Sequence, residues 1–264
     1  METNNSFSFQ RLMLLGKQSL IINKKMIGIS LAGFAGFLFI FLVITQYMSN
    51  PGIWDYKEYT VIFTCLFFSC GIIYSSFSFP AFRSKEKSMA YLMLPVSVAE
   101  KFTFELLTRI VAFIILMPLL YWVEANLAGA LVHHFRPEFA HYKFSFIEAY
   151  YNIVKDGKFE FWALVLTIQG ILFVFIAPFA GASYFSKSPL LKTMFTFTLI
   201  IAGYGLFVYL LVKGLYLEGI HPAGERVLFI NSQDGALVFT AVMATAINLC
   251  LLAIAWFRLK EREA

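Results

Sequence analysis

Residues 26–47 read MIGISLAGFAGFLFIFLVITQY and contain no charged side chain. A helix needs about 20 such residues to cross a hydrocarbon core of about 30 Å. Five further segments are similarly long and apolar, so the predicted spans are 26–47, 59–79, 110–130, 161–182, 194–212 and 236–257. These runs are continuously apolar and lack the alternation of barrel strands. The expected fold class is an all-α polytopic membrane protein with six transmembrane helices.

The composition of the whole chain agrees with this expectation. Of its 264 residues, 59% are hydrophobic and 14% are charged, whereas soluble domains are about 45–50% apolar and about 25% charged. The net charge of +5 does not indicate nucleic-acid binding, because the charges lie in short connections between apolar runs. Cys65, Cys70 and Cys250 lie inside those runs and predict neither a disulfide framework nor a metal site.

The distribution of Lys and Arg predicts the orientation in the membrane. With the N-terminus inside, 14 of the 21 Lys and Arg residues are cytoplasmic, whereas 10 of the 16 Asp and Glu residues are external. This bias is typical of cytoplasmic loops. We therefore expect both termini on the cytoplasmic side of the cell (inner) membrane, with residues 1–25 as an N-terminal segment, 26–257 as the membrane domain and 258–264 as a tail.

The segment before the first span has the pattern of an interfacial helix. Five nonpolar residues recur at helical spacing, namely Phe9, Leu12, Met13, Gly16 and Leu20. Ser6 or Ser8 could cap the start of this helix. The basic residues of this segment lie away from that stripe. We expect a helix on the inner leaflet; the alternative is a basic tail that only enforces the topology.

The connection at residues 80–108 is too long for a tight turn between two helices. Pro95 cannot continue a helix, and Ser97 followed by Glu100 forms the pattern of a capping box. We therefore expect a helix, a break at Pro95 and a capped helix that runs into the third span. Such an elbow with apolar residues on the cytoplasmic face could receive a partner protein.

Two external connections carry less information. The segment 133–160 contains His133, His134 and His141, but their spacing does not match a zinc motif, so a solvated loop is expected. The segment 213–235 is interrupted by several glycines and one proline. It forms either short helices that dip back toward the bilayer or an ordinary loop.

Polar residues inside the predicted spans are few. The candidates are Gln46, Glu124, Gln169 and Asn248, and of these only Glu124 is ionisable, near the outer end of its span. A proton relay is therefore not expected. Glycines that permit close helix contact are Gly28, Gly33, Gly36, Gly203 and Gly205. Nothing in the sequence predicts a catalytic residue, a bound cofactor or a metal ligand.

The residues Lys85-Glu86-Lys87, the run Leu92-Met93-Leu94-Pro95-Val96-Ser97 and Glu100 are similar to a cytoplasmic loop of ABC-2-type ABC transporter permeases. The motif covers about twenty residues, and the resemblance in architecture covers nearly the whole chain. Ser88-Met89, Val98 and Glu105 depart from the family pattern.

The resemblance implies a membrane-spanning permease subunit of an ATP-driven exporter. It implies an interfacial helix before six spans, a re-entrant segment at 213–235, and a second membrane half, identical or different. A separate ATPase would bind ATP and dock on Arg83, Lys85, Glu86, Lys87, Leu94, Pro95, Ser97, Glu100 and Lys101. The apolar spans favour a hydrophobic or amphipathic substrate. Two alternatives remain, a scaffold or sensor subunit without transport and an intramembrane enzyme that uses Glu124 and the external histidines.

Overall fold

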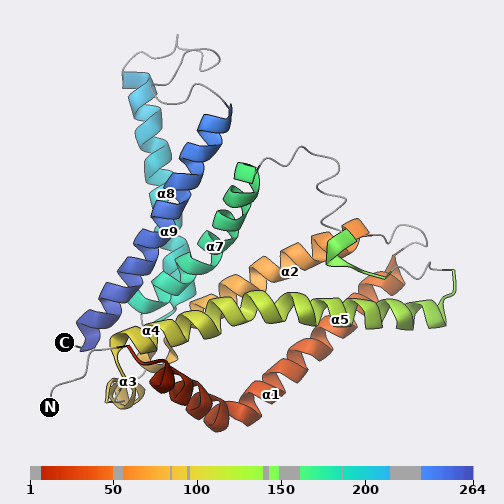
Figure 1. The fold of residues 1–264 in the computed structure, drawn as a ribbon. Helices are drawn as coiled ribbons and strands as arrows, with labels where there is room; N and C mark the ends of the chain where they lie inside the picture. Colours follow the sequence, from red (N-terminus) through yellow and green to blue (C-terminus); the bar gives the residue numbers. More distant parts are fainter. Residues whose placement is uncertain are drawn as a thin grey trace. The chain divides into compact units, whose positions relative to one another are not determined.

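The computed structural model describes residues 7–49, 56–83, 85–93, 96–138, 143–148, 161–185, 187–214 and 233–263 (Figure 1). Within these ranges the chain is helical and contains no strand. The elements are α1 (Phe9–Met48), α2 (Tyr56–Ser76), the 3-10 helix η1 (Pro80–Arg83), α3 (Lys85–Leu92), α4 (Val98–Leu106), the π-helical turn η2 (Leu107–Val111), α5 (Ala112–Phe135), α7 (Phe161–Tyr184), α8 (Pro189–Gly214) and α9 (Gln233–Glu263).

Five helical segments of the described residues are long and apolar enough to cross a membrane. They are Phe9–Met48, Tyr56–Ser76, Val98–Phe135, Leu164–Tyr184 and Leu237–Arg262. This confirms the expected class, an α-helical membrane protein with several spans. The remaining predicted span, 194–212, falls in α8, whose described apolar portion is Pro189–Gly203. The count of six and the orientation therefore stay predictions.

The helices differ from the predicted spans mainly at their ends. The second span was expected to reach Phe79, but α2 ends at Ser76 and Phe79 has a φ of 53°. A left-handed residue cannot continue a right-handed helix. The first helix begins at Phe9 and the helical stretch Val98–Phe135 exceeds the predicted 110–130 at both ends. Hydropathy marks only the part of a helix that lies in lipid, whereas hydrogen bonding continues beyond it.

The chain divides into two compact units, and each is described by itself. The first comprises Met1–Gly71 and Leu94–Lys158. In this unit α1 packs on α5 and α4, and it changes direction between its darker N-terminal part and the rest (Figure 1). Helices α2 and α5 are joined by a buried hydrogen bond. The hydroxyl of Tyr121 donates to the backbone carbonyl of Tyr59 at 2.7 Å, and both residues are buried.

The second unit comprises Ile72–Met93 and Phe159–Ala264. Here α7 packs against both α9 and α8, with Phe175 and Phe179 in the core. The turn after α2 joins this core because the rings of Phe79 and Phe179 lie 5.1 Å apart. A Cβ built on Gly181 would overlap Thr193 of α8, so α7 and α8 approach too closely there for any side chain on α7.

Many large apolar side chains point away from both cores. Ile29 is 74% exposed, Ile201 is 70% exposed and Leu249 is 61% exposed. So many exposed large apolar side chains are unusual on a soluble monomer. It is expected where lipid tails replace water as the solvent. The exposed surface therefore supports the membrane class independently of helix length.

Candidate functional site

The predicted capping box at the start of α4 is confirmed. The amide of Ser97 donates to Glu100 Oε2 at 2.9 Å, and the amide of Glu100 donates to the Ser97 hydroxyl oxygen at 3.4 Å. These reciprocal bonds satisfy two amides that a helix start otherwise leaves unpaired. They also fix the point at which the chain enters the helical stretch leading to the third predicted span.

Glu100 has a second role that the sequence did not indicate. Its other oxygen, Oε1, accepts from the amide of Ser8 at 2.7 Å and lies 3.2 Å from Arg11 Nε. The side chain of Glu100 is completely buried. One carboxylate therefore joins the start of α1 to the start of α4, across 92 residues of sequence.

The N-terminal part of α1 lies against α4 through its small and apolar residues. Leu12 and Leu15 are buried, and a Cβ on Gly16 would lie 3.7 Å from the ring of Phe104. Three members of the predicted stripe point outward instead, since Phe9 is 61%, Met13 62% and Leu20 61% exposed. Ser8 is the N-cap residue, but its side chain makes no capping bond. The helix thus has one face toward α4 and another free to contact lipid.

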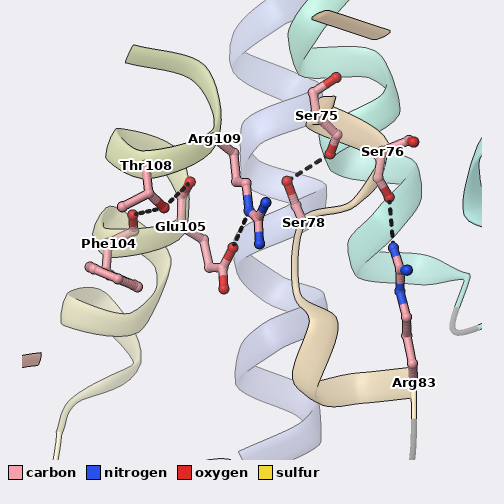
Figure 2. Close-up of polar contacts among 8 residues, drawn as sticks. All are labelled: Ser75, Ser76, Ser78, Arg83, Phe104, Glu105, Thr108 and Arg109. Carbon is pink, nitrogen blue, oxygen red and sulfur yellow. Dashed lines mark hydrogen bonds and ion pairs between the residues drawn. The ribbon is translucent and has the colours of Figure 1, made fainter. Parts of the chain in front are cut away.

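The junction of α4 with α5 is a π-helical turn, where the backbone makes a wider turn than in an α-helix. The Thr108 hydroxyl donates to the carbonyls of Phe104 at 2.8 Å and Glu105 at 3.3 Å (Figure 2). The Glu105 carboxylate lies 3.5 Å from Arg109 Nε in the same figure. Lys101 and Glu105 are both buried. Single π-turns of this kind often occur at functional sites.

The predicted docking residues before Leu94 belong to the second unit. Arg83 ends η1 and is exposed, and Glu86 is exposed in the first turn of α3. Met89 and Met93 are 61% and 82% exposed. Lys85 and Lys87 lie in α3, but their side chains are outside the described residues, as are Leu94 and Pro95 entirely.

The predicted docking segment therefore contains two kinds of residue. Arg83 and Glu86 are on the surface, whereas Glu100 and Lys101 have almost no exposed surface. A buried side chain cannot contact a docked protein in this conformation. Glu100 instead positions α4 relative to α1, and surface contacts would come from the segment Pro80–Met93.

Of the polar candidates inside the spans, two lie together. Asn248 Nδ2 on α9 donates to the side-chain oxygen of Gln169 at 2.8 Å and to its carbonyl at 3.1 Å. Gln46 is buried on α1, and its Nε2 has no hydrogen-bond partner in the part of the chain that the structure describes. Glu124 is half-buried on α5. The pair at Asn248 holds α7 to α9, as polar side chains commonly do in membranes.

The predicted external loop 133–160 is in part a packed segment, which corrects the expectation of a solvated loop. Helix α5 continues through His133 and His134 to Phe135. Phe144 is 2% exposed, and its ring lies 5.3 Å from Tyr59 and 5.5 Å from Tyr121. His141 is outside the described residues. The alternating Phe144 and Phe146, followed by Ile147, were the sequence signal for this contact.

The contacts described above are structural and electrostatic. Within the described ranges no group of three His, Cys, Asp or Glu side chains could hold a metal ion. The glycines at 28, 33, 36 and 203 have open space where a Cβ would lie, while Gly181 is the position where two helices meet closely. Comparison of the chain with protein-family models, with curated proteins and with solved structures gives no match.

Proposed function

We propose that this chain is the membrane-spanning subunit of an ATP-driven exporter of the ABC-2 type. In this proposal six spans place both termini in the cytoplasm, and a separate ATPase binds and hydrolyses ATP. A second membrane half, identical or different, completes the path for a hydrophobic or amphipathic substrate. Hydrolysis would bias two alternative packings of the helices, which moves the substrate outward.

The observation that carries the proposal is the exposed surface of α3. This short helix lies outside the apolar segments and combines Glu86, which is exposed, with Met89, which is 61% exposed. Methionine side chains adapt to irregular partner surfaces, and exposed charges set the orientation of a partner. A docked ATPase needs such a surface at the cytoplasmic end of the membrane domain.

The contact between α1 and α4 also supports the exporter proposal. A protein docked on α3 can transmit force to the spans only through the chain on either side of α3, and on the C-terminal side that chain leads into α4. The buried Glu100 carboxylate ties α4 to Ser8 and Arg11 of α1, and α4 continues through η2 into α5. Movement of the α4 start would therefore reach two candidate spans. Open space beside Gly28, Gly33 and Gly36 leaves room on α1 for the second membrane half.

The test is co-purification of an ATPase with the chain, expressed with its genomic neighbours in mild detergent. Glu86→Lys reverses an exposed charge on α3 and should abolish capture of the ATPase. Glu138→Lys is the matched control, because its side chain is 70% exposed at the opposite, predicted external side. Glu100 is unsuitable for this test, since reversal of a buried carboxylate would disturb the fold itself.

The alternative of a scaffold or sensor subunit is distinguished by ATP turnover. In an exporter, added substrate stimulates hydrolysis by the co-purified ATPase, and Glu86→Lys removes this stimulation. If an ATPase binds but added substrate does not stimulate ATP hydrolysis, the chain is a scaffold or sensor subunit and the exporter proposal is wrong. If no ATPase is captured while Glu138→Lys and wild-type chains are equally well folded, the permease proposal fails.

A further inference from the structure

The second unit contains a pocket of about 270 Å³ at the end of α2 and the start of α8. One side is formed by Ser76, Phe77 and Arg83, and the other by residues 188–191. Because the last turn of one apolar helix and the first turn of another line the same pocket, both ends lie at one level. In a membrane protein that level is a boundary between lipid tails and water.

Arg83 supplies the positive charge of this pocket. Its Nη2 donates to the carbonyl of Ser76 at 3.4 Å, as Figure 2 shows. Its guanidinium carbon lies 4.5 Å from the centre of the Phe77 ring. These two contacts hold the guanidinium beside the pocket while the side chain remains exposed. A planar guanidinium is suited to phosphate, because it offers paired donors in a fixed geometry.

The surroundings of the pocket match a phospholipid rather than a small soluble ion. Its remaining walls include the apolar side chains of Phe77, Pro189 and Leu190. Leu191 at the rim is 70% exposed, and Phe195 one turn further along α8 is 64% exposed. An acyl chain could follow this apolar face of α8 away from the pocket. A free phosphate would gain nothing from such walls.

The local charge favours an anionic headgroup. Lys187 and Lys192 flank the α8 start and are both exposed, and Lys192 Nζ lies 5.7 Å from the Phe185 ring centre. Basic residues near the membrane surface strengthen the binding of anionic lipid. Basic pockets between helices at the cytoplasmic side are typical sites for such headgroups.

We propose that the pocket at Arg83 binds the phosphate of an anionic phospholipid, with the acyl chains along α8. This site is independent of the exporter proposal, because it requires only that the chain spans a membrane. It would be present equally in a scaffold subunit. The lipid would bridge the end of α2 and the start of α8, and it would stabilise this part of the second unit.

The test uses the purified full-length chain in a neutral detergent. Dioctanoyl phosphatidylglycerol, dioctanoyl phosphatidylcholine and inorganic phosphate are titrated separately, and binding is followed by native mass spectrometry and thermal shift. We expect phosphatidylglycerol to bind the wild type, and Arg83→Gln to raise its half-saturating concentration about tenfold, because a hydrogen bond to a charged group is lost. Phosphatidylcholine should bind more weakly than phosphatidylglycerol.

Arg136→Gln is the matched control. Its guanidinium also lies beside an aromatic ring, 5.2 Å from the centre of Tyr47, and donates to a backbone carbonyl at 3.0 Å. This variant should bind phosphatidylglycerol like the wild type. Leu190→Trp fills the pocket without changing the charge and should also weaken binding. It keeps the proposal testable if Arg83→Gln does not fold.

Three results would overturn the proposal. Equal binding of phosphatidylglycerol by the wild type and both pocket variants would show that the pocket is not the site. Equal affinity for phosphatidylcholine would remove the role of the anionic headgroup. Full competition by inorganic phosphate at the same concentration would assign the pocket to a soluble anion instead of a lipid.

Discussion

At the scale of single residues, Glu100 shows how one buried side chain can organise two helices. Its Oε2 completes the capping box with Ser97, and its Oε1 receives the Ser8 amide and faces Arg11. A buried carboxylate is stable only when such donors surround it. Bonds of this kind contribute about 1.5–3 kcal/mol because one partner is charged. The Glu100 carboxylate therefore holds the start of α1 and the start of α4 together.

Replacement of this carboxylate should be costly. Glu100→Ala removes the acceptor for the amides of Ser8 and Ser97, so we expect the free energy of unfolding to fall by about 2–3 kcal/mol. Chemical unfolding in detergent, followed by circular dichroism, measures the change. Glu261→Ala is the control, because Glu261 is 64% exposed and its loss should change stability by less than about 0.5 kcal/mol. Equal stability of the two variants would remove the proposed role of Glu100.

Gly181 is the second residue whose size is constrained. A Cβ there would overlap Oγ1 of Thr193 and approach its Cβ to 2.8 Å. Gly181→Ala should therefore lower the unfolding free energy by about 1–3 kcal/mol through overpacking. Gly33→Ala is matched in chemistry but has open space, so it should be neutral or slightly stabilising. Melting temperatures in detergent compare the two.

A second substitution checks the physical reason for this prediction. Thr193→Ala removes the hydroxyl and methyl groups that the new Cβ would meet, so the double variant should be less destabilised than the sum of the single variants. Simple additivity would mean that the contact with Thr193 is not the cause of the destabilisation.

At the scale of elements, the segment after α5 is anchored mainly by the buried ring of Phe144. Phe144 is buried between Tyr59 and Tyr121, and the side-chain amide of Asn126 donates to the Phe144 carbonyl at 3.2 Å. Phe63 adds an edge contact to Phe146, with ring centres 4.9 Å apart. The segment thus covers the aromatic side chains at one end of the α2–α5 pair. A polar loop at this place would leave these side chains exposed.

Phe144→Ala should release this segment. Loss of a buried aromatic side chain costs about 3–5 kcal/mol in a core, which exceeds what the few remaining contacts of so short a segment supply. Trypsin should then cleave after the exposed Lys143 at least several times faster than in the wild type. Ile147→Ala in the same segment is the control, because Ile147 is 81% exposed. Equal cleavage of both variants would contradict the anchoring role.

At the scale of the whole molecule, the number of membrane crossings depends on helix α8. Helix α8 has 26 residues, or about 39 Å at 1.5 Å per residue, so it is long enough to span. If α7, α8 and α9 all cross, Glu138 and Glu261 lie on opposite sides. If α8 does not cross, both lie on the same side. The positive-inside distribution predicts the first arrangement.

Cysteine labelling decides between these topologies. In a background without Cys65, Cys70 and Cys250, Glu138→Cys should react with a membrane-impermeant maleimide in intact cells. Glu261→Cys and Lys17→Cys should react only after permeabilisation; all three side chains are exposed in the structure. Labelling of both Glu138→Cys and Glu261→Cys in intact cells would mean that α8 does not cross the membrane.

The sequence by itself determined the features that depend on neighbours along the chain. Continuous apolar runs predicted the membrane class and the approximate place of each long helix, because burying backbone polar groups in lipid requires helices. The box of Ser97 and Glu100 was predicted correctly, since both partners lie within one turn. Helix ends were less accurate, as at Ser76, because hydropathy reports the surrounding solvent and not the hydrogen bonding.

Only the tertiary structure decided which distant residues meet. The link of Glu100 to Arg11, the packing of Phe144 on Tyr121 and the approach of Gly181 to Thr193 each join two separate elements of the chain. In a chain whose spans are almost uniformly apolar, hydropathy does not distinguish a face toward lipid from a face toward another helix. Small differences in side-chain shape and a few polar groups determine which face of a helix contacts another helix. The partners of these groups are known only once the helices are packed.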